Sequence, residues 1–398
     1  MRKIMLTVLG IALVIGMVSC GKKGSSSEKV EKSPAVKSAD KGPIKIGAIF
    51  AVTGPASFLG APEANTAKML VEKINADGGL LGRQIKLILK DSGASPEKAV
   101  SFAKQLIEEE KVVAIIGPST SGETLQIKPI CEEAKMVLVS CAAAEKIVNP
   151  VAKYVFKTPQ KDSQAVAWIF QTIKGMGITK VAVVTGNTGF GKAGKQQLES
   201  VAEKYGITIV ISEVYDKKST DLTAVLTKVK GMNAEAVINW SIVPAQAIVP
   251  KNMKQLGMNI PLFQSHGFGN VKYVEQAGKA AEGIIFPCGR LLIADTLSDD
   301  SPQKTVLQNY KKDYETRYNE DVSTFGGHSY DSLMIVVKAI ETAGTTDRDA
   351  VRDAIENMKG FVGTGGVFNF SAEDHNGLDM DAFEMLTVKD GKFTALKQ

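Results

Sequence analysis

The sequence predicts an α/β protein built on two doubly wound parallel sheets, and three features carry that prediction. From residue 44 onward, short runs rich in β-branched residues alternate with amphipathic stretches, which is typical of β-α-β units around a parallel sheet. The alternation occurs once up to about residue 161 and again from about residue 162. The length of 398 residues also suggests two domains.

The first set of predicted strands and helices lies in the amino-terminal part of the chain. Strands are expected at 44–50, 84–90, 112–117 and 136–140. Between them, the helix expected at 96–110 has Ser95 as its N-cap and Pro96 in its first turn, both of which favour a helix start. The sequence therefore predicts one complete sheet with helices in this part.

The second set follows the same rhythm. Strands are expected at 180–186, 207–214, 234–240 and 260–264, with helices near 163–175, 191–205, 220–231 and 244–257. After residue 291 the pattern turns helical, at 302–318, 328–343 and 347–358, before two final strands near 366–370 and 382–388. Because no new sheet begins there, we expect these helices to return to the first sheet.

Composition excludes several classes of protein. Hydrophobic residues make up 44% and charged residues 23% of the chain, as in an ordinary globular protein. The formal net charge of +5 is small for this length, and it leaves no basic footprint for nucleic acid.

The first twenty residues are typical of a secretory signal. Arg2 and Lys3 precede an apolar run at 4–18, which ends in Ser19 and Cys20. A cysteine after a small residue at the end of such a run resembles the bacterial lipobox, in which the thiol is acylated.

The alternative to lipidation is a plain periplasmic protein with an incidental Cys20, since Met17 stands where the lipobox usually has leucine. Residues 21–43 have almost no large apolar side chain and are expected to form a flexible tether.

The three remaining cysteines, Cys131, Cys141 and Cys288, have irregular spacing and predict neither a disulfide framework nor a zinc site. Buried free thiols are expected. A bridge between Cys131 and Cys141 is the alternative in an oxidising compartment.

Several segments together resemble the type I periplasmic binding proteins, the leucine-binding protein-like family that serves ABC importers of branched-chain amino acids and related ligands. The segments are IKIGAIFAVTGPASFLG, KINADGGLLGRQIKLILKDSGASPEKA, IIGPSTSGET, GNTGFGKAG and FGGHSYDSLMIVVKAI. The resemblance implies two lobes joined by three hinge crossings, with ligand held between them. It places lobe one at 44–161 plus 292–366 and lobe two at 162–291 plus 367–398.

The resemblance also implies partners and a location. A small organic acid would be the ligand, ABC permease subunits the membrane partner, and the periplasm or the outer face of the cytoplasmic membrane the location. A monomer without cofactor, metal or enzymatic activity is expected. A sensory receptor of the same fold is the alternative to a transport subunit.

Two loops predict an anion site. Ligands of open α/β sheets bind beyond the carboxyl ends of the strands, where loops lead into helix amino termini. One such loop holds Ser119, Thr120 and Ser121, and the next holds Ala142, Ala143 and Ala144. The resemblance implies that Ser121, Ala142 and Ala144 bind a carboxylate, although a hydroxyl residue often replaces Ala144 in the family. The alternative for Thr120 or Ser121 is a simple helix cap.

Apolar contacts with the ligand are expected from aromatic and aliphatic residues in other loops. Phe58 and Phe190 lie in glycine-bounded loops, so rings from the two lobes would enclose an apolar group. Each aromatic has a core position as its alternative. The other candidates are Leu59, Trp240 or Ile242, and Phe325.

His266, in the segment QSHGFGN, decides the predicted ligand class. Amino-acid binders of the resembled family have an acidic residue in this loop that pairs with the ligand ammonium. An ammonium buried without a counter-charge is unfavourable by several kcal/mol. We therefore expect an acid without an α-amino group, such as an aromatic acid or a 2-oxo acid. A structural histidine is the alternative.

Motifs for other functions are incomplete. Gly189, Gly191 and Gly194 spell GxGxxG, but they begin too far after the strand for a dinucleotide site. Ala193 stands where a P-loop needs Ser or Thr. Asp331 stands where a hydrolase nucleophile elbow needs glycine.

His375 with Asp374 and Asp379 is a possible metal set, but a lone histidine among turn residues is expected to be solvent-exposed.

Overall fold

A computed structural model describes residues 42–397. The predicted signal, Cys20 and almost all of the predicted tether lie outside these residues. Among residues 42–397, no helix combines the length and the apolar character needed to cross a membrane.

The first sheet has five parallel strands in the order β2-β1-β3-β4-β5. β1, β3, β4 and β5 are almost entirely buried, as expected for strands that helices cover on both faces. β5 was not predicted, because its three residues are too short to show a pattern. The strands are β1 (Ile44–Phe50), β2 (Ile85–Asp91), β3 (Ala114–Ile116), β4 (Val137–Ser140) and β5 (Val155–Lys157).

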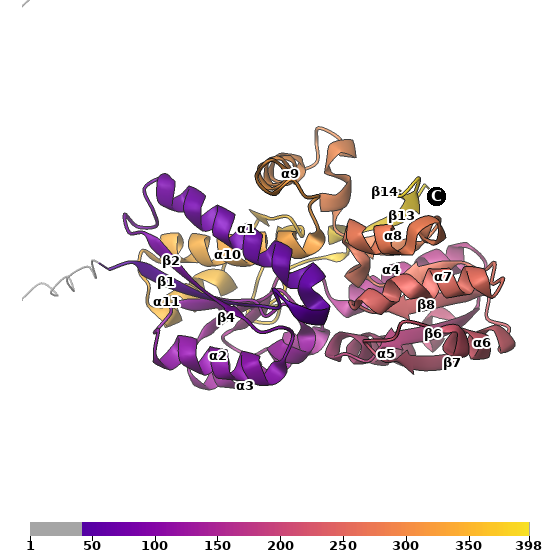
Figure 1. The fold of residues 1–398 in the computed structure, drawn as a ribbon. Helices are drawn as coiled ribbons and strands as arrows, with labels where there is room; N and C mark the ends of the chain where they lie inside the picture. Colours follow the sequence, from indigo (N-terminus) through magenta and orange to yellow (C-terminus); the bar gives the residue numbers. More distant parts are fainter. Residues whose placement is uncertain (1–41, 398) are drawn as a thin grey trace, which may run out of the picture. The chain divides into compact units, whose positions relative to one another are not determined.

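Helices from both ends of the chain cover this sheet (Figure 1). The long α10 packs along α1, so the prediction that the late helices return to the first sheet is confirmed. We call the first sheet and its helices lobe one. The helices are α1 (Ser57–Ala76), α2 (Pro96–Glu108), α3 (Ser121–Glu133), α9 (Lys304–Tyr318), α10 (Thr324–Ala343) and α11 (Arg348–Glu356).

The second sheet, with its helices, forms lobe two, and its strand order is β14-β13-β10-β9-β8-β6-β7. The strands are β6 (Lys180–Gly186), β7 (Thr208–Tyr215), β8 (Ala236–Trp240), β9 (Leu262–Gln264), β10 (Ile285–Cys288), β13 (Glu384–Lys389) and β14 (Lys392–Ala395). The helices are α4 (Asp162–Gly175), α5 (Gly189–Val201), α6 (Thr223–Gly231), α7 (Ile248–Gln255) and α8 (Val271–Ala277).

The second sheet is mixed rather than wholly parallel, because β13 pairs antiparallel with β10 and with β14. Asp390 and Gly391 form the two-residue turn between β13 and β14, and both have positive φ. An Asp-Gly pair suits such a hairpin turn, and antiparallel strands need no crossover helix.

Three segments connect the lobes, after β5, after β10 and between β12 (Val367–Phe368) and β13. Side chains tie two of these segments together. Nε2 of Gln160 donates to the carbonyl of Ala382 at 3.1 Å, and Nδ2 of Asn376 donates to the carbonyl of Pro159 at 2.8 Å. The two-lobed α/β architecture predicted from the sequence is thus the observed one.

The predicted lobe boundary at residues 366 and 367 does not match the packing. Phe368 and Phe370 are fully buried in the core of lobe one, with strand residues of the first sheet. The reason is the two-stranded hairpin of β11 (Phe361–Val362) and β12, which holds this segment against lobe one. The other lobe boundaries stay a prediction.

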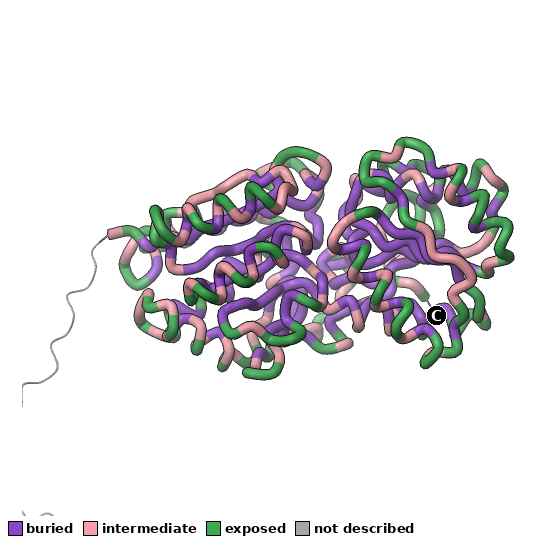
Figure 2. The backbone as a smooth tube through the Cα atoms, turned by 90° about the horizontal axis from the view of Figure 1, so that it is seen from below, coloured by how far each residue is buried: buried purple, intermediate pink, exposed green. Residues whose placement is uncertain are grey.

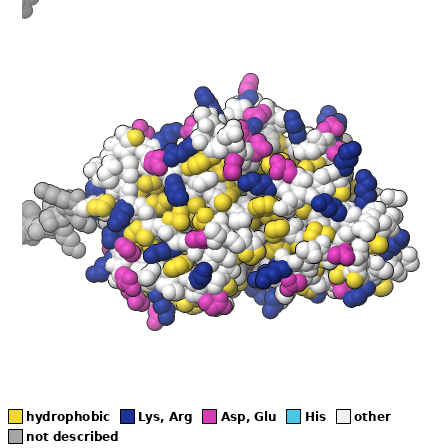
Figure 3. All heavy atoms as spheres, in the orientation of Figure 1, with side chains coloured by type: hydrophobic (Ala, Val, Ile, Leu, Met, Phe, Trp, Pro, Cys, Tyr) yellow, Lys and Arg dark blue, Asp and Glu magenta, His cyan; other side chains and the backbone are white. Residues whose placement is uncertain are grey.

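Burial follows the sheets in both lobes, since buried backbone is concentrated in the strands and exposed backbone in the outer helices and turns (Figure 2). On the face in Figure 3, basic and acidic side chains are interspersed. Within the described residues, Cys131, Cys141 and Cys288 are buried free thiols, so the alternative bridge is not formed.

Candidate functional site

A small cavity of about 20 Å³ lies between the lobes, beyond the carboxyl ends of several strands. Lobe one lines it with Leu59, Ser119, Ser121, Cys141, Ala142, Ala143, Phe325 and His328. Lobe two lines it with Phe190, Ile242, His266 and Gly267, and Pro159 comes from the first connecting segment. Eight of the twelve predicted site residues meet here, and Phe58, Thr120, Ala144 and Trp240 do not.

The loop after β3 is held from behind by a buried carboxyl group. The backbone N–H of Ala51 donates to Oγ of Ser119 at 2.9 Å, and that hydroxyl also bonds to the carboxyl of Glu63. Burial raises the pKa of Glu63 well above its ordinary value. Glu63 thus holds Ser119, which lines the cavity, from the interior of lobe one.

Thr120 caps α3 rather than lining the cavity. Its Oγ1 accepts the backbone N–H of Glu123 at 3.4 Å and donates to the carboxylate of the same residue at 2.5 Å. The helix-cap alternative therefore describes Thr120. Ser121 and Gly122 form the start of α3, where backbone N–H groups have no partner four residues earlier, and Ser121 lines the cavity.

Two of the amides expected to bind a carboxylate are engaged within the protein. The N–H of Ala144 donates to Oγ of Ser121 at 3.2 Å, and that of Ala142 donates to Oγ of Ser140 at 3.0 Å. Ala144 is fully buried away from the cavity, so its assignment as a ligand contact is wrong. On this side the cavity is therefore lined by Ser121 at the start of α3 and by Ala143.

The apolar walls differ in part from the prediction. Phe190 of α5 lines the cavity, but the aromatic ring from lobe one that lines it is Phe325, at the start of α10. Phe58 instead packs edge-to-face on Tyr273, with ring centroids 5.3 Å apart. Trp240 is fully buried behind Phe190, at 5.6 Å, so the core alternative describes it.

Two buried histidines, His266 and His328, add to the polar lining that Ser119 and Ser121 provide. The ring of His266 lies 5.2 Å from that of Phe190 and 5.7 Å from that of Phe383. Burial lowers the pKa of His266 well below its ordinary value, and it lowers the pKa of His328 to about 3. Both imidazoles are therefore neutral at neutral pH.

His328 was not predicted as a site residue, because its segment was interpreted only as an incomplete nucleophile elbow. Its place two residues after Gly326, in the first turns of a helix that begins at the cleft, was the available signal.

A buried lysine lies behind the cavity wall. Nζ of Lys157 donates to the carbonyls of Ala143, at 2.6 Å, and Gln160, at 3.0 Å. Asp162 at the start of α4 has Oδ1 3.7 Å from Nε2 of His266. Burial lowers the pKa of Lys157 and raises the pKa of Asp162.

The lobes are closed over the cavity. Nδ2 of Asn270 in lobe two donates to the carbonyl of Phe58 in lobe one at 3.0 Å. Nζ of Lys146 donates to Oε1 of Gln196 across the cleft at 2.9 Å. The structure thus shows a conformation in which residues of both lobes line the cavity.

The glycines of GxGxxG have packing roles. Gly191 lies against the carbonyl of Gly186, and Gly194 lies against the indole of Trp240, where a Cβ would clash. Thr188 caps α5 by accepting the N–H of Gly191 at 3.0 Å. This local geometry explains the pattern without a nucleotide.

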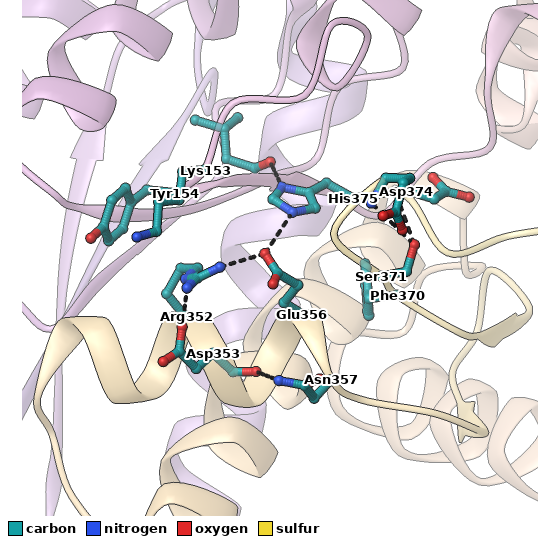
Figure 4. Close-up of polar contacts among 12 residues, drawn as sticks. Lys153, Tyr154, Arg352, Asp353, Glu356, Asn357, Phe370, Ser371, Asp374 and His375 are labelled. Carbon is teal, nitrogen blue, oxygen red and sulfur yellow. Dashed lines mark hydrogen bonds and ion pairs between the residues drawn. The ribbon is translucent and has the colours of Figure 1, made fainter.

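The expectation that His375 is exposed is wrong, because its side chain is fully buried. Figure 4 shows its imidazole ring beside the carboxylate of Glu356. Nδ1 lies 3.0 Å from the carbonyl of Val155, Nε2 lies 3.3 Å from Glu356, and the ring stacks on Phe156 at 4.1 Å. Across residues 42–397, no group of three or more histidine, cysteine or acidic side chains could hold a metal ion.

The chain is similar to a known protein family and to individual members with known names. Residues 43–392 match the family described as periplasmic binding protein. A relative named Leu/Ile/Val-binding protein homolog 3, from Brucella melitensis, is 25% identical over 89% of this chain and 94% of its own length.

Solved structures of similar fold include binding proteins of the same kind. An extracellular ligand-binding receptor from Rhodopseudomonas palustris HaA2 has a TM-score of 0.84 and 28% identity, over 89% of this chain and 99% of that one. A branched-chain amino acid transporter substrate-binding protein from Streptococcus pneumoniae, in complex with isoleucine, has a TM-score of 0.78 and 28% identity, over 89% and 98%.

Proposed function

Because this chain belongs to the periplasmic binding protein family, we propose that it is the extracytoplasmic ligand-binding subunit of an ABC importer of the branched-chain amino acid type. Its ligand is a small apolar or aromatic carboxylate without an α-amino group, an aromatic acid or a 2-oxo acid. The protein captures this ligand between its lobes and does no chemistry on it.

The observation that carries the proposal is the charge of the cavity lining. Among the described residues that line the cavity, none has a carboxylate side chain. The loop in which amino-acid binders of the family have an acidic residue holds the neutral His266 here. A buried ammonium without a counter-charge is unfavourable by several kcal/mol. An α-amino acid would therefore bind poorly where a simple acid binds well.

Lys157 supports the same ligand class. Its ammonium group donates a hydrogen bond to the carbonyl of Ala143, a residue that lines the cavity. A buried positive charge acts through a low-dielectric interior, so it attracts an anion and repels a ligand ammonium. The helix dipole of α3 adds to this attraction at Ser121 and Gly122.

A branched-chain amino acid is the second candidate ligand, favoured by one feature of the site. Oδ1 of Asp162 is buried without a hydrogen-bond partner and lies near His266. If the histidine side chain turned aside, this carboxyl group would be the nearest counter-charge for an ammonium. The Brucella relative, a Leu/Ile/Val-binding protein homolog by name, also favours this ligand class.

The test is a ligand screen by thermal unfolding followed by titration calorimetry. A ligand at about a hundred times its Kd raises the apparent stability by about 2.7 kcal/mol. We expect phenylglyoxylate or 4-methyl-2-oxopentanoate to raise the melting temperature and leucine to leave it unchanged. Tighter binding of leucine than of every acid without an amino group would overturn the proposal.

The mechanism follows from closure. Open and closed lobes interconvert, and a ligand that contacts both lobes favours the closed form, since only that form provides all its partners. The permease then recognises the closed form. A monomer suffices for this cycle, and size-exclusion chromatography with light scattering tests it.

Lipidation of Cys20 is part of the proposal, although this residue lies outside the described part of the chain. Metabolic labelling with a palmitate analogue in a bacterial host should mark the wild type and leave Cys20→Ser unlabelled. Equal labelling of both would refute it.

A further inference from the structure

We propose that His266 and His328 together recognise a second, uncharged polar group on the ligand. The ligand is then an acid with an oxo or hydroxyl substituent rather than an acid whose remainder is pure hydrocarbon. This inference rests on the proposed function and narrows its ligand class.

The two imidazoles reach one cavity from opposite lobes. His266 begins a short 3-10 helix after β9 in lobe two, and His328 lies in α10 of lobe one. Both line the cavity, and each is only 7% exposed. A single ligand group that meets both rings contacts both lobes, which is the condition for favouring closure.

Neither ring is satisfied by the protein. Nδ1 and Nε2 of His266 and Nδ1 of His328 are buried without a hydrogen-bond partner. The carboxyl oxygen of Asp162 lies 3.7 Å from Nε2 of His266, too far for a hydrogen bond. Each unsatisfied buried group is unfavourable by about 1–3 kcal/mol, so these nitrogens call for a polar partner.

His375, a buried histidine outside the cavity, provides a comparison for His266 and His328. It is as deeply buried, yet both of its ring nitrogens have partners, the carbonyl of Val155 and the carboxylate of Glu356 (Figure 4). A core role alone therefore does not explain the lack of partners at His266 and His328. Their place in the cavity lining does.

The protonation state defines the kind of partner. Burial and the nearby charge of Lys157 keep both rings neutral, so each offers one N–H donor and one acceptor nitrogen. The charged groups that face them are Lys157 of β5 and Asp162 of α4. An oxo oxygen accepts from an N–H, and a hydroxyl serves both kinds of nitrogen, whereas a methylene serves neither.

The preference for an acid with an oxo or hydroxyl group over the same acid without it should be large. Sites built to hydrogen-bond a ligand oxygen reject the analogue without it by factors of up to about 10⁴ to 10⁵, because the buried polar groups are left unpaired. Part of the preference survives if only one of the two rings engages. We therefore expect a preference of at least about 100-fold.

The experiment is a matched-pair titration by calorimetry on the full mature chain. Phenylglyoxylate is compared with phenylacetate, and 4-methyl-2-oxopentanoate with 4-methylpentanoate. We expect the oxo acid of the pair that fits to bind at least about 100-fold more tightly. In His328→Leu and in His266→Leu this ratio should fall at least about tenfold below the wild-type ratio, while Phe58→Leu, outside the cavity, should keep it.

A second measurement does not depend on variants. The chain has three histidines, so histidine-labelled protein gives few ring resonances by NMR. Addition of the oxo acid should shift those of His266 and His328 and leave that of His375 unchanged.

Equal affinity for the oxo and hydrocarbon acids, or unchanged resonances of His266 and His328 in the complex, would overturn this inference and leave the proposed function standing. Tightest binding of leucine, or no binding of either acid pair, would overturn both.

Discussion

A contact between two glycines across the cleft allows closure to be blocked without touching the ligand. Gly189 begins α5 in lobe two, and a Cβ on it would lie 2.8 Å from both N and Cα of Gly122 in lobe one. Ordinary carbon contacts begin at about 3.4 Å. In Gly189→Ala the two lobes must therefore stay about 0.6 Å further apart at this point than in the closed wild type. A gap of that size forfeits a quarter to a half of each dispersion contact.

The expected loss is therefore about 1.4–2.7 kcal/mol of binding free energy, which is about 10- to 100-fold in Kd. Calorimetry with the tightest acid found in the screen measures it. The unliganded melting temperature should not fall, since neither glycine has a positive φ and the clash exists only between lobes.

Gly122→Ala is the matched control. A Cβ there meets nothing closer than 4.0 Å, so alanine at this position should bind normally. Wild-type affinity in Gly189→Ala would show that the lobes do not approach here in the liganded protein, and the reasoning from closure would fail.

Three further predictions concern stability and reactivity. Asp331→Ala should lower the free energy of unfolding by about 3–5 kcal/mol in urea titrations, because the buried carboxylate accepts bonds from the N–H and hydroxyl of Thr364; a loss below 1 kcal/mol would contradict this. Burial lowers the pKa of His328 to about 3 from 6.5, so the unfolded chain is protonated first as pH falls below about 6.5. The wild type should then lose stability relative to His328→Gln by up to about 1.4 kcal/mol per pH unit, and a pH-independent difference would refute the assignment. Burial raises the pKa of Cys131 and of Cys288 to about 12, so mass mapping after treatment with a thiol reagent should find both unmodified until the chain unfolds.

Elements with a long periodic pattern were predictable, and short or locally ambiguous ones were not. The strand at 44–50 was predicted with its observed bounds, since β-branched residues run through it. β5 and β10 have three and four residues, which is too few to show a period. The turn at Asp390 and Gly391 was a readable hairpin signal that the prediction did not use.

The sequence by itself determined the class of the fold and the loops that meet at the cleft. Hydrophobic periodicity is local, and strand ends in a parallel sheet must gather at one edge, so Ser121 and Ala142 could be placed near one another. That Phe190 of the second lobe meets them was implied by the resemblance to the type I periplasmic binding proteins.

Only the tertiary structure decided which groups those loops present. Whether the N–H of Ala144 is available depends on the hydroxyl of Ser121, 23 residues earlier, and whether Phe58 or Phe325 faces Phe190 depends on how the lobes meet. The partners of a buried histidine also come from distant segments, which is why the sequence expected His375 in solvent and passed over His328. Hydrogen-bond satisfaction in a closed core is a property of the whole packing and leaves no local pattern to read.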